Sequence, residues 1–239
     1  MPRPRYTQVS LDATPYYHCV SRCVRRAFLC GTDNITGQNY EHRRQWIEDK
    51  LLELADIFAN AEDHCTGRFW EGRFKTQALL DETALVACMA YVDLNPIRAK
   101  MAKTPETSDH TSIQKRTAKA QQVSQPNHPR RQANDLMPFA GYPRENMPKG
   151  LPFRLTDYLV LVDWSGRILR EDKKGAISGT IPPVLERLNI EPKHWLYLTK
   201  HFESTFKGTV GSVFKLKQAC VALGYVRTPG LQGCKAFFP

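Results

Sequence analysis

The chain has 239 residues, is 41% hydrophobic and 24% charged, and carries a formal net charge of +10 at pH 7. This length can hold one large or two small globular domains, and the apolar content excludes a wholly disordered chain. No apolar run approaches the roughly 20 residues of a membrane span, and the N-terminus lacks the apolar core of a signal peptide. We therefore expect a cytoplasmic protein without a membrane partner.

The positive charge is unevenly distributed along the chain. Residues 1–100 contain 13 basic and 13 acidic residues, residues 101–150 contain 8 and 4, and residues 151–239 contain 13 and 7. Such an excess is compatible with a polyanionic partner but does not prove one. The seven cysteines lack the paired spacing of a zinc site, so we expect free thiols.

The first predicted elements are a basic arm and a strand. Arg3 and Arg5 lie in a proline-containing arm, which either contacts phosphates or is a frayed terminus. Aromatic and β-branched residues predict a strand over residues 16–23. Three arginines lie at its end and in the following turn, where they could form a solvated hairpin tip: Arg22, Arg25 and Arg26.

Residues 41–60 carry apolar side chains at helical spacing and predict a scaffold helix. Residues 67–75 then interleave aromatic with basic side chains. The aromatics either stack on unpaired bases or fill the core, while the basic residues are expected to be exposed and to meet phosphates. The aromatics are Phe69, Trp70 and Phe74, and the basic residues are Arg68, Arg73 and Lys75.

A second helix is predicted from Asp81, whose carboxylate can cap its start, to Asn95, where Pro96 should end it. Its expected apolar face is Leu85, Cys88, Met89 and Val92. Tyr91 and Asn95 are four residues apart and so project from one side of the last turn. This pair either serves chemistry on a phosphate backbone, or consists of a core-edge tyrosine and a capping asparagine.

The remaining chain divides by composition into two segments. Residues 114–150 read as a basic, proline-rich linker, with a short helix expected over 111–122; the linker is either flexible or a nonspecific backbone clamp. Residues 151–239 read as a helical domain. Its expected stripes are Trp195, Leu198, Phe202 and Phe206, then Val213, Leu216, Cys220 and Leu223, with Gly224 as the stop.

The motifs FWEGRFK and AYVDLNPIRA, together with the N-terminal PYYHCVSRCVRRAFL, resemble the REP-associated tyrosine transposases of the single-tyrosine HUH superfamily. The resemblance covers roughly residues 1–113. It implies a ferredoxin-like domain that cuts and rejoins single-stranded DNA, with Tyr91 as the nucleophile and Asn95 as a ligand of Mg²⁺ or Mn²⁺. It also implies a hairpin DNA partner, places DNA close to Arg22, Arg25 and Arg26, and allows a homodimer.

This chain departs from the family at the other two metal ligands, which form a His-hydrophobic-His strand. None of its seven histidines is two residues from another, and the expected strand is missing before residue 67. Asn95 alone cannot hold a hard cation that needs about six ligands. We therefore expect an internally deleted, catalytically impaired transposase-like DNA-binding protein. The alternatives are a domesticated non-catalytic nucleic-acid-binding protein and a nonfunctional remnant.

In fold, the sequence predicts a mixed α/β (α+β) protein: an incomplete transposase-like domain over residues 1–113, a linker and a mainly helical C-terminal domain. Helices that lose part of the sheet on which they pack would expose apolar faces. The N-terminal half is therefore expected either to be loosely folded or to depend on a partner.

Overall fold

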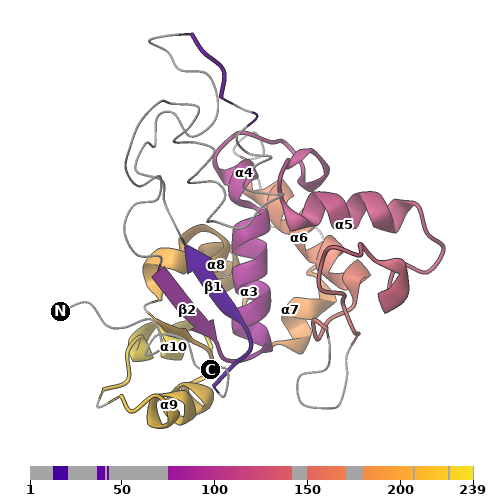
Figure 1. Cartoon of the computed structure of the whole chain (residues 1–239). Helices are drawn as coiled ribbons and strands as arrows, with labels where there is room; N and C mark the ends of the chain where they lie inside the picture. The colour runs from indigo at the N-terminus through magenta and orange to yellow at the C-terminus, as the bar shows by residue number, and fades with distance from the viewer. Residues whose placement is uncertain are drawn as a thin grey trace. The chain divides into compact units, whose positions relative to one another are not determined.

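The fold is described from a computed structural model (Figure 1). Its described residues are 13–20, 37–40, 42, 75–141, 150–170, 180–206, 208–225 and 227–238. The chain forms two compact units, one of Met1–Tyr17 with Gln77–Pro239 and the other of His18–Thr76. The fold is mixed α/β, as the sequence predicts, whereas the ferredoxin-like topology stays a prediction.

The strands form one small sheet in the order β1 (Tyr17–Val20), β2 (Lys75–Leu79), β3 (Thr209–Val210). Strands β2 and β3 are parallel, with Ala78 opposite Thr209 and Leu79 opposite Val210. The segment expected to be mainly helical therefore supplies a strand beside β2. This strand also separates helix α8 (Pro192–Thr205) from helix α9 (Val213–Ala222).

Eight α-helices are present in the described part of the chain. Their bounds are α3 Glu82–Asp93, α4 Asn95–Arg98, α5 Ser112–Gln121, α6 Leu155–Leu169, α7 Pro183–Arg187, α8 Pro192–Thr205, α9 Val213–Ala222 and α10 Leu231–Phe237. Two 3-10 turns, η2 (Pro105–Thr107) and η3 (Pro129–Arg131), lie close to or within the segment expected as a linker. Among the described helices, none is long and apolar enough to cross a membrane.

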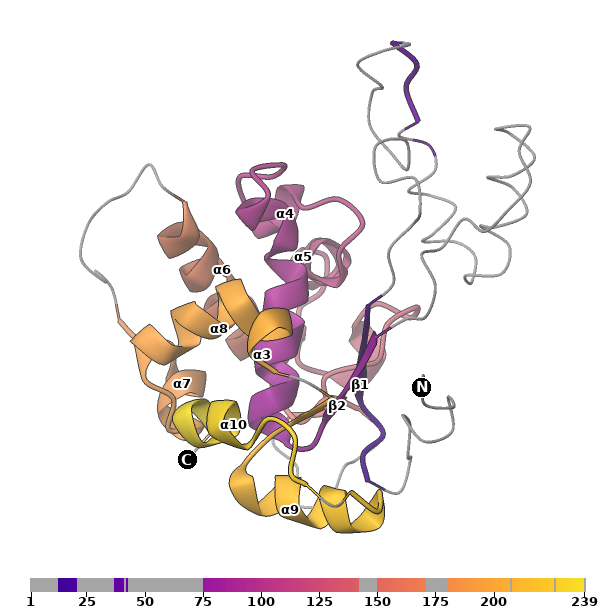
Figure 2. The same cartoon turned by 90° about the vertical axis from the view of Figure 1, so that its left-hand side faces the viewer.

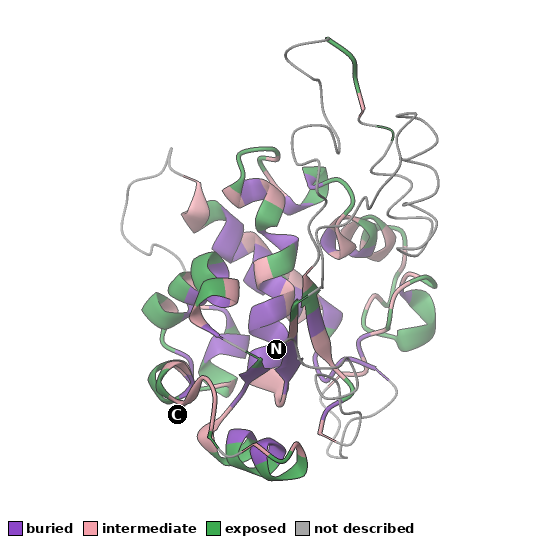
Figure 3. Ribbon diagram, turned by 60° about the vertical axis from the view of Figure 1, so that its left-hand side comes forward, coloured by how far each residue is buried: buried purple, intermediate pink, exposed green. Residues whose placement is uncertain are grey.

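Helix α3 is the centre of the larger unit. It packs on α8, and in Figure 2 it stands between strand β2 and the helices α6, α7 and α8. Burial is concentrated on this central helix, while the outer helices show exposed faces (Figure 3). The start of α3 is as predicted, because Asp81 Oδ1 accepts from the backbone N–H of Ala84 at 2.9 Å.

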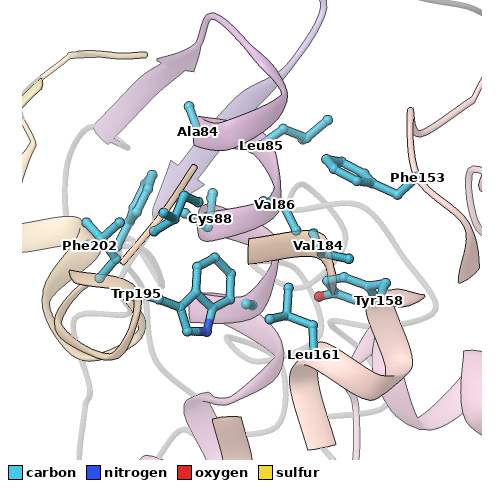
Figure 4. Packing of buried hydrophobic residues seen from close by; sticks show 14 of the residues in the cluster. Ala84, Leu85, Val86, Cys88, Phe153, Tyr158, Leu161, Val184, Trp195 and Phe202 are labelled. Carbon is cyan, nitrogen blue, oxygen red and sulfur yellow. The ribbon is translucent and has the colours of Figure 1, made fainter. Parts of the chain in front are cut away.

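The predicted apolar face of α3 is only partly right. Leu85 and Cys88 are buried and Met89 partly so, but Val92 is 45% exposed. Neighbours cover the helix on more than one side, so Ala84, Val86 and Ala90 are also buried. In Figure 4, Trp195 and Phe202 of α8, Tyr158 and Leu161 of α6, and Val184 of α7 converge on it.

Residues from all three predicted segments, 1–113, 114–150 and 151–239, pack into this one core. Phe139 and Phe153 are fully buried in the same cluster as Ile113 and the residues of α3. The segment expected as a solvated linker thus packs in part: Gln132 is buried and exchanges hydrogen bonds with the backbone of Phe139, at 2.7 and 2.9 Å. Its proline-rich, polar composition conceals this role.

Candidate functional site

Tyr91 and Asn95 flank the junction between α3 and α4. Helix α3 ends at Asp93, two residues earlier than predicted, and Asn95 begins α4 with Pro96 in its first turn. The Tyr91 ring is half-buried and lies 5.9 Å from the ring of Phe202 on α8. The phenol therefore packs at the edge of the core, and Asn95 is exposed.

Arg98, which the sequence analysis did not single out, joins the two predicted site residues. Its guanidinium carbon lies 4.1 Å from the centre of the Tyr91 ring, in cation–π geometry. The same group donates to Asn95 Oδ1 at 3.0 Å and to the backbone carbonyls of Tyr91 and Thr199 at 2.6 and 2.8 Å. Helical spacing was the available signal, since Arg98 is three residues after Asn95 and seven after Tyr91.

Burial lowers the pKa of the Arg98 guanidinium, and its interaction with the Tyr91 side chain offsets part of this shift. The group stays cationic, because arginine titrates far above neutral pH. A positive charge therefore sits between the expected nucleophile and the expected metal ligand. Arg98 also donates a hydrogen bond to the backbone carbonyl of Tyr91. This carbonyl is among the last four of α3, which have no hydrogen-bond donor within the helix.

The arrangement does not fit a divalent metal ion. Asn95 Oδ1 already accepts from a cation, which would repel Mg²⁺ or Mn²⁺ at the same oxygen. Within the described ranges, no group of three or more His, Cys, Asp or Glu residues could hold a metal ion. We therefore derive no catalytic step through a metal at Tyr91.

A buried polar network lies next to this junction, centred on Asp93. Its carboxylate accepts from the Tyr158 hydroxyl at 2.6 Å, the Ser112 hydroxyl at 3.0 and 3.1 Å, and the Ile113 backbone N–H at 3.2 Å. Burial raises the pKa of Asp93, and these hydrogen bonds only partly oppose the shift. The network fastens the end of α3 to the start of α5 and to α6, and its role is structural.

Arg116 extends the network on α5. It is 4% exposed, donates to the Met137 carbonyl at 3.1 Å and lies 4.7 Å from the centre of the Phe139 ring. Burial lowers the pKa of this guanidinium, and its interactions with Tyr158 and Asp93 oppose the change. Sequence patterns revealed the role of neither Asp93 nor Arg116, because their partners are distant in sequence.

Most of the predicted DNA-binding residues lie outside the described residues. Lys75 is the exception: it begins β2 and is exposed, as expected. It belongs to the His18–Thr76 unit, whereas Tyr91 and Asn95 belong to the other unit. The residues outside the described ranges are Arg3, Arg5, Arg22, Arg25, Arg26, Arg68 and Arg73, and the predicted helix over 41–60 also lies outside them except at residue 42.

Comparisons with protein-family models, with curated proteins and with solved structures found no match to this chain. The class of protein is therefore argued from the residues and the geometry above.

Proposed function

We propose that this chain is a cytoplasmic nucleic-acid-binding protein related to the REP-associated tyrosine transposases, and that Tyr91 does not carry out strand transfer. The observation that supports the proposal most directly is the position of Arg98. It covers the Tyr91 ring and occupies the Asn95 oxygen. The residue pair expected to act on a phosphate is thus engaged within the fold.

The chemistry of phenols supports the same conclusion. An unperturbed tyrosine has a pKa near 10 and is a weak nucleophile unless a base or metal activates it. Metal ions supply most of the charge stabilisation in comparable phosphoryl transfers. At the α3–α4 junction, the cation that lies over the Tyr91 ring is the Arg98 guanidinium. Three of its hydrogen bonds go to protein oxygens and hold α3, α4 and α8 together.

Charge supports the binding part of the proposal. Residues 101–239 contain 21 basic and 11 acidic residues and hold the whole excess of +10. Lysines and arginines that meet phosphates release counterions, so affinity should fall steeply as salt rises. The densely buried core of the larger unit argues against the alternative of a remnant that folds poorly.

The test combines a denaturing and a native gel. The full chain and a Tyr91→Phe variant are incubated with labelled single-stranded hairpin DNA and Mg²⁺ or Mn²⁺. We expect no covalent protein–DNA band, and a salt-sensitive complex that both proteins form equally. A covalent band that the variant loses would overturn the non-catalytic assignment. Absence of any complex at low salt would overturn nucleic-acid binding.

A further inference from the structure

Helix α8 carries a second stripe of side chains opposite its buried one. The buried stripe contains Trp195, Leu198 and Phe202, all fully buried. The other stripe, here called the α8 outer stripe, contains Lys193, His194, Tyr197, Lys200 and His201, and each of these residues is exposed. Spacings of three, four and seven residues place them along one face of the helix.

The rings of this stripe continue onto α10. Tyr197 and Phe237 are nearly parallel, at 8° and 5.1 Å between centres, which is typical of offset stacking. His201 lies 4.7 Å from Tyr197, and His194 meets Phe237 edge-on at 5.4 Å. Together these four rings form a continuous aromatic platform.

The platform is both anchored and accessible. Phe237 lies 6.3 Å from the buried ring of Phe206, so its inner side is fixed to the core. Tyr197 is nevertheless 45% exposed. Phe237 therefore packs against the core, whereas Tyr197 and the two histidines are exposed. Aromatic surface held rigidly in water is suited to a flat ligand.

The charged side chains beside these rings indicate which class of ligand the surface would bind. The α8 sequence contains two lysines, both on the outer stripe, and one acid, Glu203. Glu203 is half-buried and lies three residues beyond Lys200, at one end of the stripe. The α10 sequence adds Lys235 and no acid. Flat rings flanked by lysines match unpaired bases carried on a phosphate backbone.

We propose that the α8 outer stripe and Phe237 form a stacking platform for single-stranded nucleic acid. The inference rests on the proposed nucleic-acid-binding function and assigns it a surface far in sequence from Tyr91. Bases stack on the platform, while Lys193 and Lys200 contact the flanking phosphates. Paired bases within a duplex present no free faces, so the platform discriminates against duplex DNA.

The test measures binding of the full chain to a fluorescein-labelled oligothymidine and to a duplex of equal length, by anisotropy over a salt series. Tyr197→Ala should weaken binding of the single strand about 5- to 100-fold, as expected for the loss of one base stack, and change duplex binding little. Tyr197→Phe keeps the ring and should bind like the parent. Lys200→Gln should reduce the salt slope by about 0.7.

Phe214→Ala is the matched control, because Phe214 is an exposed aromatic (67%) that lies on α9, outside the platform. Circular dichroism melting confirms that each variant is folded. If the parent binds the oligothymidine and Tyr197→Ala binds it as tightly as Phe214→Ala does, the platform is wrong while nucleic-acid binding stands. If the parent binds neither nucleic acid at low salt, the proposed function itself fails.

Discussion

The Asp93 network predicts a specific pattern of non-additive stability. Replacing Asp93 with Ala removes the acceptor of the Tyr158 hydroxyl and of the Ile113 N–H, both in buried hydrogen bonds. A buried donor left without an acceptor costs about 1–3 kcal/mol. Burial raises the pKa of Asp93 because it disfavours the charged carboxylate in the core. Removing this carboxylate therefore recovers part of the free energy lost with the hydrogen bonds. We therefore expect Asp93→Ala to lower the free energy of unfolding by about 2–4 kcal/mol.

The second arm of the cycle is Tyr158→Phe. This change removes the shortest hydrogen bond to the carboxylate and should cost about 1–3 kcal/mol. In the double variant the ring at position 158 has no hydroxyl that could be left unpaired. The double variant should therefore be more stable than the sum of the single effects predicts, by about 1–2 kcal/mol.

The assay is urea unfolding at neutral pH, and its signal must come from the correct unit. Trp164 and Trp195 belong to the unit that contains Asp93, whereas Trp46 and Trp70 belong to the other. Fluorescence is therefore measured with Trp46 and Trp70 replaced by Phe throughout. Single effects that add to within about 0.5 kcal/mol would show that Asp93 and Tyr158 do not share an energetically coupled hydrogen bond, and the reasoning would be refuted.

Three further predictions follow from the same unit. Because burial raises the pKa of Asp93 in the fold, its contribution to stability is largest below its unfolded pKa of about 4 and is lost as the pH rises through the folded pKa. The stability of Asp93→Asn relative to the parent should therefore rise as the pH increases above about 4. A falling difference in urea unfolding would contradict this. The Asp81 carboxylate accepts hydrogen bonds from the backbone N–H groups of Ala84 and Ser212, at the starts of two helices. Asp81→Ala should therefore cost about 1–3 kcal/mol in thermal melting, and Asp81→Asn, which keeps one acceptor oxygen, should cost less. Equal losses in the two variants would count against the double cap. Arg98→Met should cost about 1–3 kcal/mol in urea unfolding, and an unchanged midpoint would mean that its hydrogen bonds do not hold α3 to α8.

Local signals in the sequence predicted the elements whose determinants are local. The Asp81 cap and the buried stripe of α8 both appear as expected. Each depends on residues within one or two helical turns. The end of α9 is also as predicted, since Gly224 adopts a positive φ of 64° that suits glycine.

Features set by distant contacts were not predictable in the same way. Strand β3 is two residues long and has no alternation to detect; its place is fixed by pairing with β2 and by the hydrogen bond from Gln77 Nε2 to the Phe206 carbonyl at 2.6 Å. The Asp93 network likewise joins residues 65 positions apart in sequence. At the candidate site, sequence spacing did not reveal Arg98, which lies over the Tyr91 ring and donates to Asn95 Oδ1.

The contacts of α3 bear on the expectation that part of its sheet is missing. If residues 1–113 packed alone, the faces of α3 would lie in water at a cost of about 1.5–3 kcal/mol per large apolar side chain. Instead, α8 covers one side of the helix, α6 and α7 add Tyr158 and Val184, and β3 extends the sheet beside β2. The C-terminal segment thus supplies within one chain the surface that a partner was expected to provide. Truncation before α6 should therefore destabilise α3 even though its own cap and sequence remain intact.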